Sequence, residues 1–159
     1  MSLSTDDIVF MNSTNGLGGA LTSLIPEEAL HNVFDRVSGK EAKLGDVEYR
    51  CVYIKNRSTT DTLYNATVHL ASTVSGEKEQ IEIGLGLAPL NSTEQSISDE
   101  DDAPFGITFI EDVGIENALP LGDLSAGSYK SIWIKRSILP NAPVSRESAF
   151  TLSVDGDIF

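Results

Sequence analysis

The chain has 159 residues, of which 40% are hydrophobic and 22% are charged. A chain of this length forms about one domain, and it is too apolar to be disordered as a whole. Its 24 acidic and 11 basic residues give a formal net charge of -13 at pH 7. This charge opposes direct binding to nucleic acids and to anionic membrane surfaces. Because no apolar run approaches the roughly 20 residues that span a bilayer, we expect a soluble protein.

The first residues and the cysteine content indicate where the protein is made. Residues 2–7 have neither the basic start nor the apolar core of a signal peptide. Cys51 is the only cysteine, which excludes an internal disulfide and a cysteine-based zinc cluster within one chain. Both features predict synthesis in a reducing compartment.

Residues 1–24 are expected to form a flexible N-terminal arm, because they are rich in Asn, Ser, Thr and Gly. A short apolar patch of Ile8, Val9 and Phe10 interrupts this composition, and Leu17 follows among glycines. Two interpretations stay open: a frayed terminus, or an arm whose apolar patch pairs with a neighbouring subunit as an added strand. In the second, Ile8, Val9, Phe10 and Leu17 are the expected partner-contact residues.

Residues 25–159 are expected to form a single β-sandwich domain that includes one short helix at about residues 26–38. Pro26 suits the first turn of a helix, and Gly39 supplies a C-terminal stop. The apolar positions at helical spacing are Leu30, Val33, Phe34 and Val37. This single stripe predicts that the helix packs over the end of a β core.

The segment Glu48–Asn56 is the strongest strand candidate, and neither of its faces is clearly polar. One face carries Arg50, Val52 and Ile54, and the other carries Tyr49, Cys51 and Tyr53. A strand with two apolar faces belongs inside a sheet, between the core and a covering element, for which the helix is the candidate. A turn and then the alternation over residues 66–70 predict a second strand that pairs with the first as a hairpin.

Four further segments alternate between apolar and polar residues and are expected to be strands. They are residues 81–87, 105–109, 129–136 and 150–154. In the first of them, Gly84 and Gly86 fall on the face opposite the Ile and Leu side chains, where another backbone or helix could approach closely. Six candidate strands with turns between them and no alternation of strands with helices predict an all-β sandwich.

A leucine-glycine pattern lies in the late part of the chain. Leu121-x-x-Leu124-x-x-Gly127 precedes Ile132-Trp133-Ile134, which resembles Ig-like domains, in which a similar leucine-glycine turn precedes a late strand. The expected fold is therefore an Ig-like β-sandwich with one short N-terminal helix and an extended N-terminal arm.

The sequence offers no grouping of residues for catalysis. Cys51 lies in mid-strand without a nearby His, and the two histidines, His31 and His69, lie on different expected elements. The acidic run at residues 98–102 lacks the alternating oxygen ligands and the glycine turn of a calcium loop. Trp133 is expected to be structural, with a stacking platform for a sugar or base as the alternative. We expect no enzymatic activity, no cofactor and no metal.

The first third of the chain carries a series of short motifs in a fixed order. A Gly-Gly segment comes first, followed by a helix with Leu, Asn, Val and Phe, then Ser-Gly, and then Tyr-Arg in a strand that ends in Lys-Asn. These residues are Leu17–Ala20, Ala29–Gly39, Glu41–Ala42 and Gly45–Asn56, with a looser echo in Leu121–Leu124 and Ile132–Ile134. In this order they resemble a group of small structural proteins of tailed bacteriophages. The resemblance implies a virion component and carries no site residues.

Within this resemblance, the leading expectation is an Ig-like capsid cement or decoration protein. Such a protein would be made in the bacterial host cytoplasm and would bind at junctions between major capsid subunits of the virion. Its partners would be the major capsid protein, copies of itself, or both, and it would be oligomeric in the virion. A neck, tail or baseplate component is the structural alternative. A host-attachment module with Trp133 and the tyrosines on a sugar-binding face is the alternative of a different class.

Overall fold

The computed structural model describes residues 3–25, 44–74, 79–111, 113–140 and 149–158. Two short 3-10 helices lie near the N-terminus, η1 (Thr5–Asp7) and η2 (Thr14–Gly16). The strands are β1 (Ile8–Ser13), β2 (Gly18–Gly19), β3 (Leu21–Leu24), β4 (Asp46–Asn56), β5 (Leu63–Val74), β6 (Glu79–Leu85), β7 (Glu94–Ser96), β8 (Ile110–Glu111), β9 (Leu119–Leu124), β10 (Tyr129–Ile138) and β11 (Ala149–Asp157). The predicted all-β class is confirmed.

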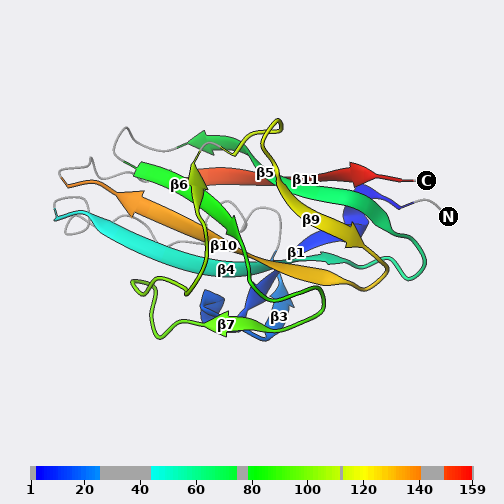
Figure 1. The fold of residues 1–159 in the computed structure, drawn as a ribbon, viewed down its shortest axis with the longest axis horizontal. Helices are drawn as coiled ribbons and strands as arrows, with labels where there is room; N and C mark the ends of the chain where they lie inside the picture. The colour runs from blue at the N-terminus through cyan, green and yellow to red at the C-terminus, as the bar shows by residue number, and fades with distance from the viewer. Residues whose placement is uncertain (1–2, 26–43, 75–78, 112, 141–148, 159) are drawn as a thin grey trace.

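The strands form a larger and a smaller antiparallel sheet and one short pair. The larger sheet has six strands in the order β3-β1-β4-β10-β6-β8, and the smaller has three in the order β11-β5-β9. The short pair consists of β2 and β7. Figure 1 shows β4 and β10 as the long central strands, with the smaller sheet on one side of them and β7 on the other. The first and the last described residues lie at the same end of the molecule.

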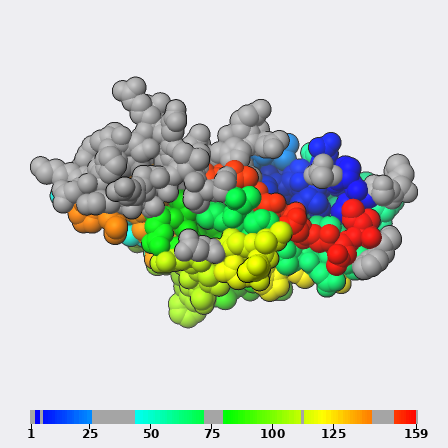
Figure 2. Space-filling view, turned by 90° about the horizontal axis from the view of Figure 1, so that it is seen from above, coloured from blue at the N-terminus to red at the C-terminus, as the bar shows by residue number. Residues whose placement is uncertain are grey.

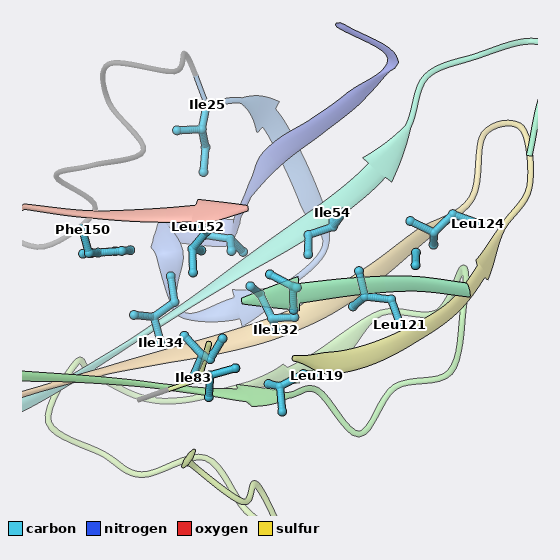
Figure 3. Close-up of a cluster of buried hydrophobic side chains, with 14 of the residues drawn as sticks. Ile25, Ile54, Ile83, Leu119, Leu121, Leu124, Ile132, Ile134, Phe150 and Leu152 are labelled. Carbon is cyan, nitrogen blue, oxygen red and sulfur yellow. The ribbon is translucent and has the colours of Figure 1, made fainter. Parts of the chain in front are cut away.

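The hydrophobic core lies between the six-stranded and the three-stranded sheet, as Figure 3 shows. The larger sheet contributes Val52, Ile54, Ile81, Ile83, Ile132 and Ile134. The smaller sheet contributes Leu63, Ala66, Val68, Leu119, Leu121, Leu124, Phe150 and Leu152. Successive side chains of a strand point to opposite faces, so the alternation read from the sequence directs these residues inward. Each large apolar side chain that is fully buried contributes about 1.5–3 kcal/mol.

The hairpin expected between the first two strands of the domain is wrong, because β4 and β5 lie in different sheets. β4 pairs with β1 and β10, whereas β5 pairs with β11 and β9. The chain crosses from one sheet to the other directly after β4, where Asn56 is fully buried. Its side-chain amide donates to the carbonyls of Asp61 at 2.9 Å and Leu124 at 2.8 Å. These two bonds hold the end of β4 against the smaller sheet.

The described part of the segment expected as a flexible arm, residues 3–24, belongs largely to the sheets. Residues 8–12 of β1 pair antiparallel with residues 52–56 of β4. The carbonyl of Phe10 accepts a hydrogen bond of 2.9 Å from the backbone N–H of Ile25. Ile8 and Phe10 pack against the hydrophobic core. The apolar patch therefore pairs with β4 of its own chain. Its side chains Ile8 and Phe10 add to the core between the two sheets.

The second apolar face of β4 is covered by the segment of residues 94–111, which we call the covering segment. Tyr49, Cys51 and Trp133 form a second buried cluster on this face, and Ile97, Ile107 and Phe109 pack against it. The rings of Tyr49 and Phe109 lie 5.5 Å apart in a tilted arrangement. The helix expected at about 26–38, which the sequence assigned to this role, lies outside the described residues.

The strand expected at residues 105–109 is wrong. Gly106 adopts a left-handed backbone with a φ of 73°, and the side chain of Gln95 takes the backbone groups that a ladder partner would use. Its Oε1 accepts from the N–H of Phe105 at 2.9 Å, and its Nε2 donates to the carbonyl of Phe105 at 2.8 Å. Extended pairing begins only at β8, where Ile110 pairs with Ile83 of β6.

Strand β9 was not expected, because its sequence contains Pro120 and Gly122. Proline removes a backbone donor and glycine weakens a strand interior. Both are tolerated here because β9 is an edge strand of the smaller sheet. Its leucines at alternate positions, Leu119 and Leu121, are the signal that a strand search could have used.

The close approach of another backbone that was expected at Gly84 and Gly86 is confirmed at Gly84, whereas side chains approach Gly86. A Cβ atom on Gly84 would lie 2.5 Å from the carbonyl oxygen of Thr108. A Cβ atom on Gly86 would overlap Ser131 Oγ and Glu94 Oε2. The two glycines thus let the covering segment lie directly on the larger sheet.

Candidate functional site

A pocket of about 360 Å³ opens between the N-terminal segment and β11. Its walls include Ile8 and Phe10 of β1 and Leu152 and Val154 of β11. Figure 2 shows the N-terminal and C-terminal parts of the chain, in blue and red, beside one another on this surface. The pocket exists because β1 and β11 lie in different sheets, so that the two strands flank the edge of the core.

The chemistry of the pocket suits binding of an apolar group. Its described polar lining residues are Ser4, Ser153 and Asp155. Among the described lining residues there is no His, Cys, Lys or Arg, so neither serine has a base beside it within the pocket. Asp155 Oδ2 instead lies 3.3 Å from Nδ1 of the buried His69 of β5. The pocket can hold a side chain or small molecule, but it lacks the groups for nucleophilic chemistry.

The structure brings two of the four expected partner-contact residues to this pocket, Ile8 and Phe10. Val9 alternates to the other face of β1 and is in register with Lys55. Leu17 follows η2, where its carbonyl accepts a 2.9 Å hydrogen bond from Ile97 of the covering segment. Contact of these four residues with a partner stays a prediction.

A buried carboxylate, that of Glu94 in β7, anchors the covering segment to the larger sheet. Glu94 is only 4% exposed. Oε2 accepts hydrogen bonds from the backbone N–H of Leu87 (2.9 Å), Ser131 Oγ (3.3 Å) and Trp133 Nε1 (2.9 Å), and Oε1 accepts from the N–H groups of Ala88 (3.1 Å) and Gln95 (3.2 Å). We call this arrangement the Glu94 hub. Because five donors occupy the carboxylate, it acts as a structural acceptor.

Tyr53 and Lys130 extend the Glu94 hub on either side. The buried Tyr53 hydroxyl accepts from the N–H of Glu94 at 2.9 Å and donates to the carbonyl of Gly19 at 2.6 Å. Lys130 Nζ donates to the carbonyls of Gly86 and Ala88, at 2.6 Å in each case. Burial lowers the pKa of Lys130, and the nearby Glu94 carboxylate opposes this shift. These contacts fix β2, the start of β7 and the chain that precedes β7 to the same face of the larger sheet.

The two side chains that the sequence singled out for reactivity or stacking are both fully buried. Burial raises the pKa of the Cys51 thiol to about 12, so the thiol stays protonated at neutral pH and is a poor nucleophile. Trp133 is fully buried and donates its indole N–H to Glu94. A ring in this position cannot stack on a sugar or base, which contradicts the use of Trp133 as a binding platform.

A buried, hydrogen-bonded pair of Glu48 in β4 and Arg136 in β10 was not foreseen. The two residues are in register on neighbouring strands, and Arg136 Nη2 lies 2.5 Å from Glu48 Oε2. Their side chains are 1% and 3% exposed. Burial raises the pKa of Glu48 to about 8, Arg136 opposes the shift, and Asp46 and Glu100 add to it. Opposite charges on two interior strands are the sequence signal that could have indicated the pair.

The raised pKa of Glu48 predicts that the protein loses stability as the pH rises. The unfolded chain releases the Glu48 proton near pH 4.5 and the folded chain near pH 8. Between these values the folded state binds more protons, so the free energy of unfolding falls with pH, by on the order of 5 kcal/mol. Urea unfolding at a series of pH values across this window measures the fall.

The control for this pH dependence is Glu48→Gln, which resembles the protonated carboxyl but does not titrate. This variant should unfold like the wild type near the acid end of the window and should lose much less stability toward the alkaline end. General repulsion within an acidic chain acts on both proteins, so it cancels in the comparison. The same slope in both proteins would contradict the assignment to Glu48.

Within the described ranges, no group of three or more His, Cys, Asp and Glu side chains could hold a metal ion. No helix among the residues that the structure describes is long and apolar enough to cross a membrane. No protein-family model and no curated protein matches the chain. The function proposed for the chain therefore rests on its own residues and their arrangement.

Proposed function

We propose that this chain is a non-enzymatic structural protein of a tailed-bacteriophage virion. Its function is that of a capsid cement or decoration protein, bound at junctions of major capsid subunits. The observation that carries the proposal is the order of residues over Leu17–Ala20, Ala29–Gly39 and Gly45–Asn56, which resembles small virion proteins of such phages. The proposed partners are the major capsid protein and further copies of this chain, and the proposed fold type is an Ig-like β-sandwich.

Features of the structure support a binding role over a catalytic one. A core between two antiparallel sheets is what an Ig-like sandwich requires. The buried carboxylates of Glu94 and Glu48 are held by hydrogen bonds within the fold. Buried side chains that bond within the fold make the domain rigid, and partners are then bound by its surface residues. A rigid domain of this kind suits a protein that reinforces an assembly.

The host-attachment alternative loses support from the burial of three of its five proposed aromatic residues. Trp133, Tyr49 and Tyr53 are buried, whereas Tyr64 is 37% exposed, and a sugar needs an exposed aromatic face. A neck, tail or baseplate component would have the same amino-acid composition as a capsid cement protein. The two differ in the number of copies per virion.

The test of the proposed function is the abundance of the chain in purified virions. Quantitative mass spectrometry against a labelled standard should find hundreds of copies per particle for a capsid cement protein. A ring-forming neck or tail component would give about six or twelve copies, because such rings have closed cyclic symmetry. A protein that does not copurify with particles at all would overturn the virion assignment.

A further inference from the structure

The covering segment holds one strongly exposed aromatic side chain, that of Phe105. It is 83% exposed. Leu87, which is 56% exposed, lies against the next residue, Gly106, where an added Cβ atom would come within 2.9 Å of Leu87 Cδ1. We call Phe105 and Leu87 the Phe105 tip. In Figure 2 the light-green part of the chain, between β6 and β9, projects from the lower edge of the molecule.

The backbone beneath the Phe105 tip is fixed on both sides. The Gln95 side chain bonds to both the N–H and the carbonyl of Phe105, and the preceding Pro104 is buried. Gln95 and Leu87 each donate a backbone N–H to the carboxylate of Glu94. The Glu94 hub therefore holds the backbone of Leu87 and the residue that clamps Phe105.

A fixed, exposed aromatic ring differs from the scattered exposed apolar residues that are normal on soluble proteins. An isolated exposed apolar residue does not indicate a binding site, because no interaction holds it in one place. The backbone of Phe105 is ordered before any partner arrives, so little conformational entropy is lost on binding. Aromatic side chains of this kind are the usual anchors at the centre of protein interfaces.

The charge around the Phe105 tip indicates the chemistry of its partner. Residues 94–111 contain six acidic residues, Glu94, Asp99, Glu100, Asp101, Asp102 and Glu111, and no Lys or Arg. Glu94 is buried, Glu100 pairs with Arg50, and the Lys130 ammonium is bonded to the carbonyls on either side of Leu87. The remaining four carboxylates, of Asp99, Asp101, Asp102 and Glu111, are exposed. A partner that accepts the ring must therefore present an apolar pocket with a basic rim. A second copy of this chain fits poorly, because each copy carries a net charge of -13.

We propose that the Phe105 tip is the docking point of this protein on the assembled capsid shell, where the Phe105 ring enters an apolar pocket that is rimmed by Lys or Arg. The identity of the partner rests on the proposed virion function. The location of the docking point rests on the exposure, the fixed backbone and the acidic surroundings of Phe105. Gln95 acts as a positioning residue, because it holds the backbone of Phe105 without reaching the partner pocket.

The test is cosedimentation of the purified protein with capsid shells assembled without it. Phe105→Ala should weaken binding by at least about 10-fold, as expected for a hot-spot aromatic. Gln95→Ala should weaken binding by a smaller factor, because it frees the turn and leaves the ring in place. Tyr64→Ala is the matched control, since Tyr64 is a partly exposed aromatic on the smaller sheet, and it should bind like the wild type. Added salt should weaken wild-type binding.

The outcomes separate the two proposals. Wild-type protein that does not bind the shells would overturn the capsid function and this docking site together. Wild-type binding that Phe105→Ala leaves unchanged would overturn the docking site alone. Sedimentation equilibrium of the wild type and of Phe105→Ala tests whether the Phe105 tip binds a second copy of this chain instead. If the wild type self-associates and Phe105→Ala does not, the tip is a self-association site and the proposal of a capsid partner is overturned. Thermal melting of each variant excludes unfolding as the cause of lost binding.

Discussion

Replacing Glu94 with alanine is expected to lower the free energy of unfolding by about 3–5 kcal/mol. The substitution leaves the buried N–H groups of Ala88 and Trp133 and the N–H of Leu87 without their acceptor. An unsatisfied buried donor costs about 1–3 kcal/mol, and the loosened covering segment adds lost packing over Tyr49. Trp133 is the only tryptophan and bonds directly to Glu94, so its fluorescence during urea unfolding reports both the stability and the loss of the contact.

Two further variants determine whether the Glu94 carboxylate itself is responsible. Glu94→Gln should give an intermediate loss, because one side of the amide is an NH2 group that would face N–H donors in place of an acceptor. Glu116→Ala, at an exposed glutamate, should change stability by less than about 0.5 kcal/mol. A Glu94→Ala variant within about 1 kcal/mol of the wild type would contradict the structural role of the hub.

The sequence predicted that β4 needs a cover on each face, but it did not identify the covering segment. The alternation of residues 48–56 shows two apolar faces. That both faces must be covered can therefore be inferred without the tertiary structure. In the sequence, the first part of the covering segment resembles a solvated loop because it is polar and acidic, and residues 105–109 resemble a strand. A buried carboxylate is recognisable only through its donors, and these include Leu87 and Trp133, which lie on other parts of the chain.

Strand faces could be predicted, whereas the assignment of strands to sheets could not. Alternation shows which side chains share a face, but it does not show which sheet a strand joins. The crossing after β4 depends on a bond from Asn56 to Leu124, across a large separation in sequence. Strand β1 resembles an arm in sequence because its neighbours are polar, although its own apolar residues Ile8 and Phe10 reach the core.

The alternation of Phe105 with Ile107 and Phe109 predicts a strand where the structure has the turn of the proposed docking point. The local signal for a turn was present, because Pro104 precedes Phe105 and Gly106 follows it. The clamp by Gln95 was not visible in the sequence. By contrast, the close approach of another backbone at Gly84 was predicted correctly, since a glycine on one face of a regular strand leaves room there for a neighbouring backbone.

Replacing Arg136 with methionine is expected to destabilise the protein by an amount that increases with pH. Above about pH 8 the wild-type Glu48 is ionised and paired with Arg136, and breaking a buried pair by removal of one partner costs about 3–5 kcal/mol. Near pH 5 Glu48 is protonated in both proteins, so the loss falls to the roughly 1–2 kcal/mol of a hydrogen bond and its packing. Urea unfolding of both proteins at the two pH values measures the difference.

The double variant Glu48→Leu with Arg136→Met distinguishes the ion pair from the packing of Arg136. Removing both charges leaves no buried ion without a partner, so the double variant should recover most of the stability that Arg136→Met loses at alkaline pH. Its stability should also change little across the window between pH 4.5 and 8 in which Glu48 titrates. Equal losses for Arg136→Met near pH 5 and above pH 8, with no recovery in the double variant, would mean that Arg136 stabilises the larger sheet by packing alone. That result would also contradict the coupling of Glu48 to Arg136, which opposes the rise that burial causes in the pKa of Glu48.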